Sequence, residues 1–238
     1  MISKTSFLLN HFLLLLAAST LHHHPVAAVD QVVNAQLVEA TAQAPTRLER
    51  LKLYPADNDT VFDFYGQPGY GWAPGSVVNA NTATFPYATG NGMTLALLSL
   101  GPCSMLPPHY HPRAANFVVA VNGTTDTYMI EENGARTVKV TLDAGKATIF
   151  PAASIHLMEN RGCENTQLVS ALNSEDTGTL NIANVLFQLL PHDIVMPAVG
   201  YGPADLNGTA GRVPPVGFGS IYGRRECLDR CRKAGYKV

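Results

Sequence analysis

Short runs of β-prone residues, broken by turn signals, fill the middle of the chain. Within each run, apolar residues alternate with polar ones or branched and aromatic residues cluster, as is typical of strands. Asn-Gly, Glu-Asn-Gly, Asp-Ala-Gly and Arg-Gly sequences between the runs favour tight turns. Many short strands at close spacing predict a sandwich or a small barrel. The expected strands are residues 94–100, 116–121, 125–130, 137–142, 147–150 and 167–172.

The pattern changes after residue 173, where apolar residues recur at helical spacing until Pro191. A Ser-Glu-Asp sequence at 174–176 suits a helix start, so we expect one helix to close the barrel sequence. Residues 197–223 are rich in Gly and Pro, and residues 224–238 form a basic patch with two cysteines. We expect this end to be a tail tied by its own disulfide, in preference to a partner-binding element.

Two segments precede the expected strands. Residues 1–28 combine Lys4, a leucine-rich apolar stretch and a small-residue end, which is the layout of a secretory signal. A membrane anchor is the alternative, but the apolar stretch is shorter than the roughly 20 residues that a spanning helix needs. Residues 29–60 have a weak helical period and form an N-terminal arm, which either packs on the barrel or is a loose linker.

Composition and charge narrow the class of protein. The 238 residues are 46% hydrophobic and 14% charged, with 20 Gly and 16 Pro, which suits one turn-rich globular domain. Lys and Arg number 16 against 18 Asp and Glu, for a net charge of −2, and no run is strongly basic. Nucleic acid is therefore excluded as a main partner, because nothing would hold a phosphate backbone.

A secretory signal makes N-glycosylation and disulfide formation available to the chain, whether it is secreted or stays in the lumen of the secretory pathway. Three glycosylation sequons occur in turn-like sequence, and they begin at Asn58, Asn122 and Asn207.

Four cysteines follow the signal, and an even count in an oxidising compartment favours disulfides. Four cysteines allow three connectivities; we expect Cys103 to pair with Cys163 and Cys227 to pair with Cys231. No Cys-x-x-Cys pair occurs, so the spacing is not that of a zinc site.

Histidines supply the candidate chemistry. Of the four that follow the signal, three fall in two short stretches: His109 and His111 in the first, and His156 in the second. Side chains at positions i and i+2 of a strand point to one face, so His109 and His111 would face the same side of a sheet. Two imidazoles would thereby reach one ion.

These stretches resemble the two motifs of the cupin superfamily, and more closely its secreted germin and spherulin-like branch. The first motif is matched by His109, His111 and Gly123. The second motif is matched by Gly145, Pro151, His156 and Asn160. Similarities outside the two motifs extend the resemblance from about residue 61 to residue 190.

The resemblance implies an all-β fold, a single cupin jelly-roll barrel with C-terminal helices. It further implies that the histidines line the mouth of the barrel, that Cys103 and Cys163 bridge beside it, and that the chain forms a homo-oligomer. The expected organisation is a signal peptide at residues 1–28, an N-terminal arm at residues 29–60 and the barrel at residues 61–190. A C-terminal helical segment with a disulfide-tied tail follows at residues 191–238.

The chain departs from the family pattern at two positions. Ala153 replaces a turn glycine, which a small residue tolerates. Asn116 stands where the family has a glutamate, its only anionic metal ligand. An amide in place of that carboxylate lowers the attraction for a divalent manganese or iron ion and raises its reduction potential. Asn116 also cannot act as a general base.

One hypothesis is an enzyme without a required cofactor, a cyclase similar to the hetero-Diels–Alderases of terpene and tropolone natural-product biosynthesis, which join a quinone methide to an alkene. His109, His111, Asn116 and His156 would donate hydrogen bonds to the enone oxygen and so act as catalytic residues. Small apolar organic substrates would be the partners. The residues expected to shape the substrate site are Met105, Tyr110, Phe117, Met158 and Asn160.

A second hypothesis keeps a divalent metal, manganese, iron or copper, on His109, His111 and His156. Such a protein would be an oxidoreductase acting on superoxide or on a small acid such as oxalate. A third hypothesis is a non-catalytic surface or storage module, which rests on the sequons and disulfides.

Overall fold

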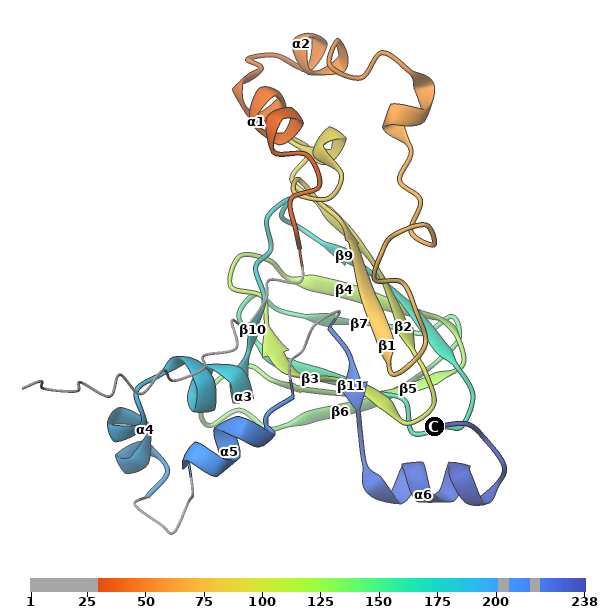
Figure 1. Cartoon of the computed structure of the whole chain (residues 1–238), viewed down its shortest axis with the longest axis vertical. Helices are drawn as coiled ribbons and strands as arrows, with labels where there is room; N and C mark the ends of the chain where they lie inside the picture. The colour runs from red at the N-terminus through yellow and green to blue at the C-terminus, as the bar shows by residue number, and fades with distance from the viewer. Residues whose placement is uncertain (1–29, 201–205, 215–218) are drawn as a thin grey trace, which may run out of the picture.

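Two antiparallel sheets packed face to face form the body of the protein (Figure 1). The structure is a computed structural model that describes residues 30–200, 206–214 and 219–238. The predicted secretory signal at residues 1–28 lies outside the described residues. Among the helices that are described, none has the length and apolar character needed to cross a membrane.

The order of the strands in the two sheets is that of a jelly roll, as the resemblance implied. Every pair of neighbouring strands is antiparallel. The first sheet contains, in spatial order, β1 (Gly75–Ala80), β2 (Thr94–Leu100), β9 (Thr166–Leu172), β4 (Asn116–Asn122) and β7 (Ala147–Phe150). The second contains β10 (Leu180–Asn181), β3 (Ser104–Tyr110), β8 (Ile155–Glu159), β5 (Thr124–Ile130) and β6 (Val138–Asp143), with β11 (Ile221–Tyr222) paired to β3.

The hydrophobic core lies between the inner faces of the two sheets. Val118, Met158 and Leu168 are completely buried there, and each is flanked along its strand by residues that face outward.

All six runs predicted from the sequence are strands, within one residue at each end. Five strands of the described chain were not predicted: β3 carries two prolines and β10 and β11 have two residues each, whereas β1 and β8 are strands of ordinary length that were missed.

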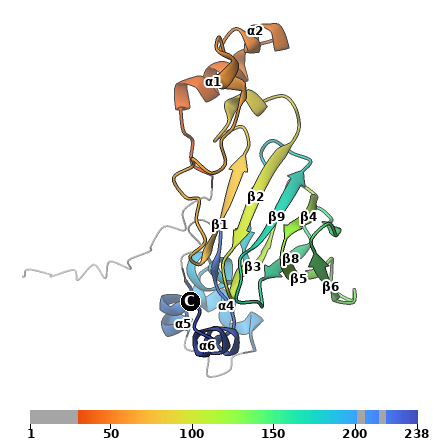
Figure 2. The same cartoon turned by 90° about the vertical axis from the view of Figure 1, so that its right-hand side faces the viewer.

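The N-terminal arm packs against one end of the barrel, which decides between the two alternatives left open by the sequence. Its helices are α1 (Ala35–Gln43), α2 (Arg47–Leu51) and the 3₁₀ helix η1 (Asp57–Thr60). The hydroxyls of Thr41 and Tyr54, both buried, hydrogen-bond at 2.6 Å. The ring of Tyr54 packs edge to face against the ring of Tyr87, which belongs to the 3₁₀ helix η2 (Pro86–Ala88). Figure 2 shows this arm at the opposite end from the C-terminal helices.

The helical segment after β9 begins later than predicted. The helical residues are those of α3 (Ile182–Asn184) and the π-helical turn η3 (Val185–Leu189). The expected start at residues 174–176 is wrong because these polar side chains bind elsewhere: the carboxylate of Glu175 accepts hydrogen bonds from the backbone N–H groups of Gly90 and Gly92, at 2.5 and 3.2 Å. The described residues after this turn contain three more helices, α4 (His192–Ala198), α5 (Leu206–Arg212) and α6 (Arg225–Lys233).

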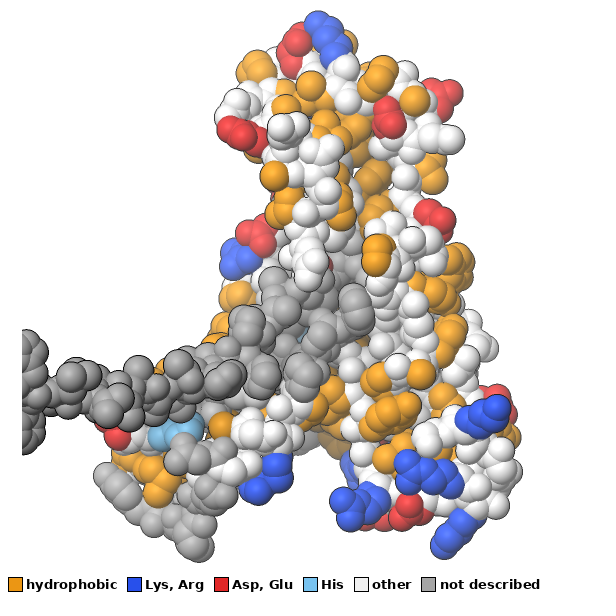
Figure 3. All heavy atoms as spheres, viewed as in Figure 1, with side chains coloured by type: hydrophobic (Ala, Val, Ile, Leu, Met, Phe, Trp, Pro, Cys, Tyr) orange, Lys and Arg blue, Asp and Glu red, His pale blue; other side chains and the backbone are white. Residues whose placement is uncertain are grey.

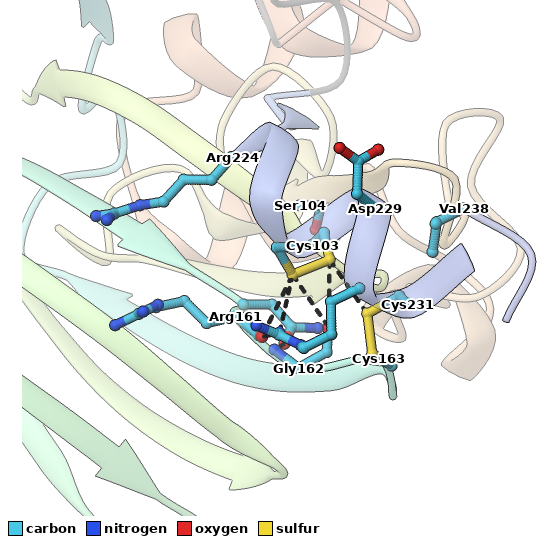
Figure 4. Close-up of a disulfide and its surroundings, with 12 residues drawn as sticks. Cys103, Ser104, Arg161, Gly162, Cys163, Arg224, Asp229, Cys231 and Val238 are labelled. Carbon is cyan, nitrogen blue, oxygen red and sulfur yellow. Dashed lines mark hydrogen bonds between the residues drawn. A yellow bond between two sulfur atoms is a disulfide. The ribbon is translucent and has the colours of Figure 1, made fainter. Parts of the chain in front are cut away.

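The predicted disulfide pairing is wrong. Cys103 pairs with Cys227 and Cys163 pairs with Cys231, so both bonds join α6 to the barrel (Figure 4). Cys227 and Cys231 lie one turn apart on α6, where side chains at i and i+4 are about 5–6 Å apart, too far for a disulfide. Both point instead at the loops around Cys103 and Cys163. The C-terminus is therefore fastened to the barrel and is not a tail tied only to itself.

Basic side chains cover the outside of α6 (Figure 3). Arg224, just before α6, forms an ion pair at 2.9 Å with Glu159 of β8, which is 3% exposed.

Two of the three sequons are in exposed positions: Asn58 lies in η1 and Asn122 ends β4. Asn207 belongs to α5, but its side chain lies outside the described residues. Glycosylation at the three asparagines stays a prediction.

We expect removal of the second disulfide, in a Cys163→Ala/Cys231→Ala variant, to lower the free energy of unfolding by about 2–5 kcal/mol, because the unfolded chain loses a covalent constraint. Chemical denaturation measures this. Peptide mapping under non-reducing conditions should yield Cys103 joined to Cys227 and Cys163 joined to Cys231 in the unaltered protein. A peptide joining Cys103 to Cys163 would contradict the structure.

Candidate functional site

Three histidines meet on the inner face of the second sheet. His109 of β3 and His156 of β8 are directly paired across the two strands, and their ring centroids are 4.4 Å apart. His111, two residues beyond His109, faces the same way, with its ring centroid 5.2 Å from that of His109 and 5.3 Å from that of His156. The period of the strand thus brings these rings together, as predicted.

Each of the three rings is held by a hydrogen bond from Nδ1 to a backbone carbonyl. His109 bonds to Pro107 at 2.7 Å, His111 to Gly178 at 2.8 Å and His156 to Ser154 at 2.9 Å. A carbonyl oxygen can only accept, so Nδ1 carries the proton in each ring, and the neutral ring keeps a lone pair on Nε2. One ring nitrogen from each histidine lies within 4.8 Å of the other two. The three rings therefore present acceptors, which suits a metal ion.

Burial keeps the three imidazoles neutral. Desolvation lowers the pKa of His156 from 6.5 to about 4, and the hydrogen bond from Nδ1 to Ser154 opposes this only in part. Desolvation also lowers the pKa of His109, well below 6.5, and neighbouring His156 and His111 lower it further. The pKa of His111 is lowered by desolvation too. Neutral imidazoles are the form that binds metals.

Asn116 faces the histidines from the opposite sheet, as the first residue of β4. Its side-chain oxygen is buried and has no hydrogen-bond partner, and the same is true of Nε2 of His156 and of the hydroxyl of Ser170 on β9. Buried polar atoms without partners are costly, and such atoms in a native fold indicate a ligand, an ion or a water. This donor set fits a divalent metal ion.

A small cavity adjoins these groups. Its volume is about 40 Å³, which is space for roughly three waters. Much of the wall is apolar, with Leu98, Leu106, Met158 and Leu172 among its residues. Its polar groups include His109, His111, Asn116 and Ser170, and no charged side chain of the described part of the chain lines it. A small ligand would find hydrogen-bonding groups here but no side-chain cation.

Ala153 supports the site through the turn between β7 and β8. Its backbone φ is 64°, the left-handed conformation that glycine adopts more readily, which explains why the family pattern has glycine there. The N–H of Ala153 donates to the carbonyl of His111 at 3.1 Å. The next residue, Ser154, accepts the Nδ1 hydrogen bond of His156.

Five predicted site residues lie together in the structure: His109, His111, Asn116, His156 and Met158. Met158 is completely buried, and it points inward from β8 as His156 does. The roles assigned to these residues in catalysis or metal binding stay predictions.

Four other residues predicted to line the substrate site lie elsewhere. Phe117 follows Asn116 along β4, so it points to the outer face of the sheet, where it is 56% exposed. Tyr110 likewise alternates with His109 on β3 and faces away from the cavity. Met105 pairs with Ile221 of β11 beneath the C-terminal segment. Asn160 is buried in a loop, where Nδ2 donates to the carbonyls of Leu100, Gly101 and Glu164.

Several cavity residues escaped prediction because they lie outside both motifs. Asn79 of β1 and Ser170 of β9 face inward, and Thr177, Thr179 and Asn181 approach from the segment after β9. Strand alternation could have identified Ser170 as inward-facing. For the other four, the sequence carries no comparable signal.

Acidification is expected to destabilise the metal-free protein. The unfolded histidines bind protons near pH 6.5, whereas the pKa of His156 in the fold is about 4, so stability falls as the pH drops through this window. Between pH 7 and pH 5 the loss from His156 alone is roughly 2 kcal/mol. Chemical denaturation at both pH values measures it.

A His156→Phe variant, whose ring can still stack on Phe150 as that of His156 does, should lose the part of this dependence that His156 contributes, whereas the part from His109 and His111 remains. Equal stability of the unaltered protein at pH 7 and pH 5 would contradict burial of neutral histidines. Carboxylates with depressed pKa values, such as Asp143, lose their charge mainly below pH 5 and do not obscure the comparison.

Comparison with known proteins places this geometry in context. The cupin family model matches residues 70–204. Spherulin-1A of Physarum polycephalum is 34% identical over 165 residues, which are 67% of this chain and 65% of that protein. Spherulin-1B of the same organism is 30% identical over 213 residues, 89% of this chain and 84% of that protein. Germin-like proteins of rice also match.

The fold is shared with solved structures. A structure of oxalate oxidase superposes with a TM-score of 0.60 and 18% identity, over 67% of this chain and 83% of that one. At this level of identity the likeness concerns the fold alone. The match to Spherulin-1A spans just under two thirds of that protein.

Proposed function

Since the chain belongs to the cupin family, in its germin and spherulin branch, we propose that it is a metal-dependent oxidoreductase that acts on a small molecule. One observation carries the proposal: three buried, neutral imidazoles, His109, His111 and His156, each have Nδ1 on a carbonyl and one ring nitrogen within 4.8 Å of the others. Three protein ligands with an open position are typical of catalytic metal sites.

The donor set also indicates which ions it prefers. Imidazole suits zinc, copper, iron and nickel, whereas carboxylates suit manganese, and Asn116 offers only a neutral amide oxygen. We therefore expect manganese to bind more weakly than these four ions. A redox-active ion held here would supply one-electron exchange, as dismutation of superoxide to dioxygen and hydrogen peroxide requires.

The protein's own residues fix the ligands and restrict what enters. The carbonyls of Pro107, Gly178 and Ser154 hold the three rings by their Nδ1 hydrogen bonds, which fixes tautomer and ring orientation. The apolar wall limits water, and the cavity volume of about 40 Å³ favours a substrate of a few atoms. Without a lysine or arginine on the described wall, only a bound cation would attract an anion such as superoxide.

The cyclase hypothesis has less support. It needed the histidines to donate hydrogen bonds to an enone oxygen, but a neutral ring with its Nδ1 proton on a carbonyl can only accept at Nε2. A quinone methide with a terpene is also much larger than the cavity, and Tyr110 and Phe117, expected to shape its walls, face elsewhere. We therefore prefer the oxidoreductase.

Metal content tests the proposal directly. Protein purified from a eukaryotic host, without added metal or chelator, should carry close to one zinc, copper, iron or nickel ion per chain by elemental analysis. Iron- or copper-loaded protein should then dismutate superoxide, with oxalate oxidation assayed alongside, and chelation should abolish the activity. Protein that neither carries nor takes up these ions would favour the non-catalytic module.

We further propose that the chain works in the secretory pathway, either secreted or in the lumen. Support comes from its two disulfides, which persist in oxidising compartments. N-terminal sequencing of secreted protein, expected to begin at Val29, tests both this proposal and the predicted signal.

We propose that two copies of the chain associate through the outer face of the first sheet. Leu95, Ala171, Phe117 and Ile149 form one cross-strand row there, and the three large side chains are 43%, 56% and 53% exposed. The adjacent row, which includes Val169 and Val119, is also apolar. Apolar patches of this kind mark interfaces, and a twofold dimer buries one patch against its copy.

A lysine at position 117 is expected to separate the dimer. Phe117→Lys would place two like charges in the centre of the interface, so light scattering after size exclusion should show a monomer where the unaltered protein shows a dimer. Tyr65→Lys, at a site that is 63% exposed elsewhere, is the matched control and should stay dimeric. A monomeric unaltered protein, or a dimeric Phe117→Lys variant, would contradict the proposal.

A further inference from the structure

The candidate metal site has no anionic residue of its own. No acidic side chain of the described chain lines the cavity, and Asn116 occupies the position where the motif has glutamate. A dication held by three neutral imidazoles would keep its full charge in a largely apolar cavity. Such a charge is costly to bury unless a negative group lies nearby.

A carboxylate does reach this region from a distant part of the sequence. Asp30, in the segment that leads into α1, accepts a hydrogen bond at 2.6 Å from Nδ2 of Asn79, which lines the cavity. The segment is anchored close by, since the N–H of Val33 donates to the carbonyl of Ala83 at 3.2 Å. Asp30 is half-buried and 49 residues from Asn79 along the chain.

Among the described residues, Asp30 is the acidic side chain that hydrogen-bonds to a residue lining the cavity. The other acids nearby are engaged: Glu159 pairs with Arg224, and Asp176 pairs with Arg113.

We infer that Asp30 is the anionic group of this site, a positioning residue that stabilises a divalent cation on the three imidazoles from outside the ligand set. The inference rests on the proposed metal-binding function. The hydrogen bond from Asn79 holds Oδ1 of this carboxylate beside the wall of the cavity. The N-terminal arm thereby completes the site in place of the carboxylate that β4 lacks.

A predicted signal ending at residue 28 leaves Asp30 in the mature chain. The arm would then have a function besides packing on the barrel: it ties the metal site to the first residues of the mature protein. Asp30 is half-buried and its charge would act on the ion without direct contact, so the contribution of Asp30 to metal affinity should weaken as salt is added.

Zinc affinity of the purified full chain, measured by competition with a chromophoric chelator, tests the inference. Asp30→Asn should weaken zinc binding about 10-fold at low salt, at the lower end of the range for residues that support metal ligands. The loss should shrink in high salt. Asp30→Glu, which keeps the charge, should recover most of the affinity. Asp57→Asn is the matched control, because it removes an exposed carboxylate elsewhere in the arm.

The outcomes separate the inference from the proposed function. If the unaltered protein binds no zinc, the proposed function fails. If the unaltered protein binds zinc and Asp30→Asn binds it equally well, the inference about Asp30 is overturned and the function stands. Equal losses in Asp30→Asn and Asp30→Glu, or a loss that salt does not change, would assign Asp30 a structural role and would also overturn the inference.

Discussion

Replacement of His109 by alanine is expected to abolish metal binding by this protein. His109 is one of three imidazoles that lie close to one another and is 6% exposed, with its ring centroid 4.4 Å from that of His156 and 5.2 Å from that of His111. Its loss leaves two neutral ligands for a dication. Loss of a residue that only supports a ligand costs about 10–100-fold in affinity, so loss of the ligand should cost more than about 100-fold.

The measurement is zinc affinity by chelator competition, with elemental analysis of the purified variant. His109→Leu is the companion variant, since leucine fills the buried space that alanine leaves empty and preserves folding. His192→Ala is the control, because His192 lies in α4, outside the cluster. Zinc binding of normal strength by either His109 variant would show that the three histidines are not the site.

Replacement of Asn116 by glutamate should change stability in opposite directions in the metal-free and the metal-loaded protein. Without metal, the new carboxylate occupies a position that is 3% exposed, where the amide oxygen already lacks a hydrogen-bond partner. A buried unpaired carboxylate is destabilising by several kcal/mol unless it takes up a proton. We expect the metal-free Tm to fall, by about 2–4 °C for each kcal/mol lost.

With metal, the same carboxylate becomes a fourth and anionic ligand. Affinity should rise by about 10-fold or more, and the preference should move toward manganese and iron, which accept carboxylate oxygen readily. Thermal unfolding with and without each ion measures both effects, because a tightly bound ion raises Tm by mass action. Asn116→Gln, which keeps the amide, is the control. A glutamate variant that is destabilised equally with and without metal would contradict a metal site at Asn116.

The two opposing effects give a physical reason for the asparagine. A carboxylate at this position destabilises the fold unless a cation is bound, whereas an amide is tolerated without one. If Asp30 supplies charge from the arm, the site keeps an anion that is partly solvated and therefore less costly in the metal-free state. The histidines stay neutral for a related reason: no acidic side chain of the described residues lines the cavity, where it would stabilise their protonated forms.

Local periodicity was enough to predict much of the barrel. The runs at 94–100, 147–150 and 167–172 alternate or cluster as strands do, and the structure confirms them. The two-residue period of a strand also predicted that His109 and His111 share a face. These features depend on neighbouring residues only, so the sequence contains the information. The match of both motifs to the cupin pattern then predicted the jelly roll, which the comparisons confirm.

Strand period would also have corrected one error in the predicted site. If Asn116 points into the barrel, the next residue, Phe117, must point out, because successive side chains of a strand face opposite sides. Nearness in sequence to a histidine was a poor guide to nearness in space. Met105 and Tyr110 were misplaced for the same reason.

Other features required the tertiary structure because they join residues far apart in sequence. Cys227 and Cys231 are each compatible with several partners, and the position of α6 against the barrel selects Cys103 and Cys163. The proton on His111 is fixed by Gly178, 67 residues away. Asp30 meets Asn79 only because the arm returns to the barrel. The sequence alone thus determined the strands, the fold class and the histidine set, which follow from local spacing, whereas folding decided the disulfide partners, the tautomers and the charge near the site, which follow from contacts between distant segments.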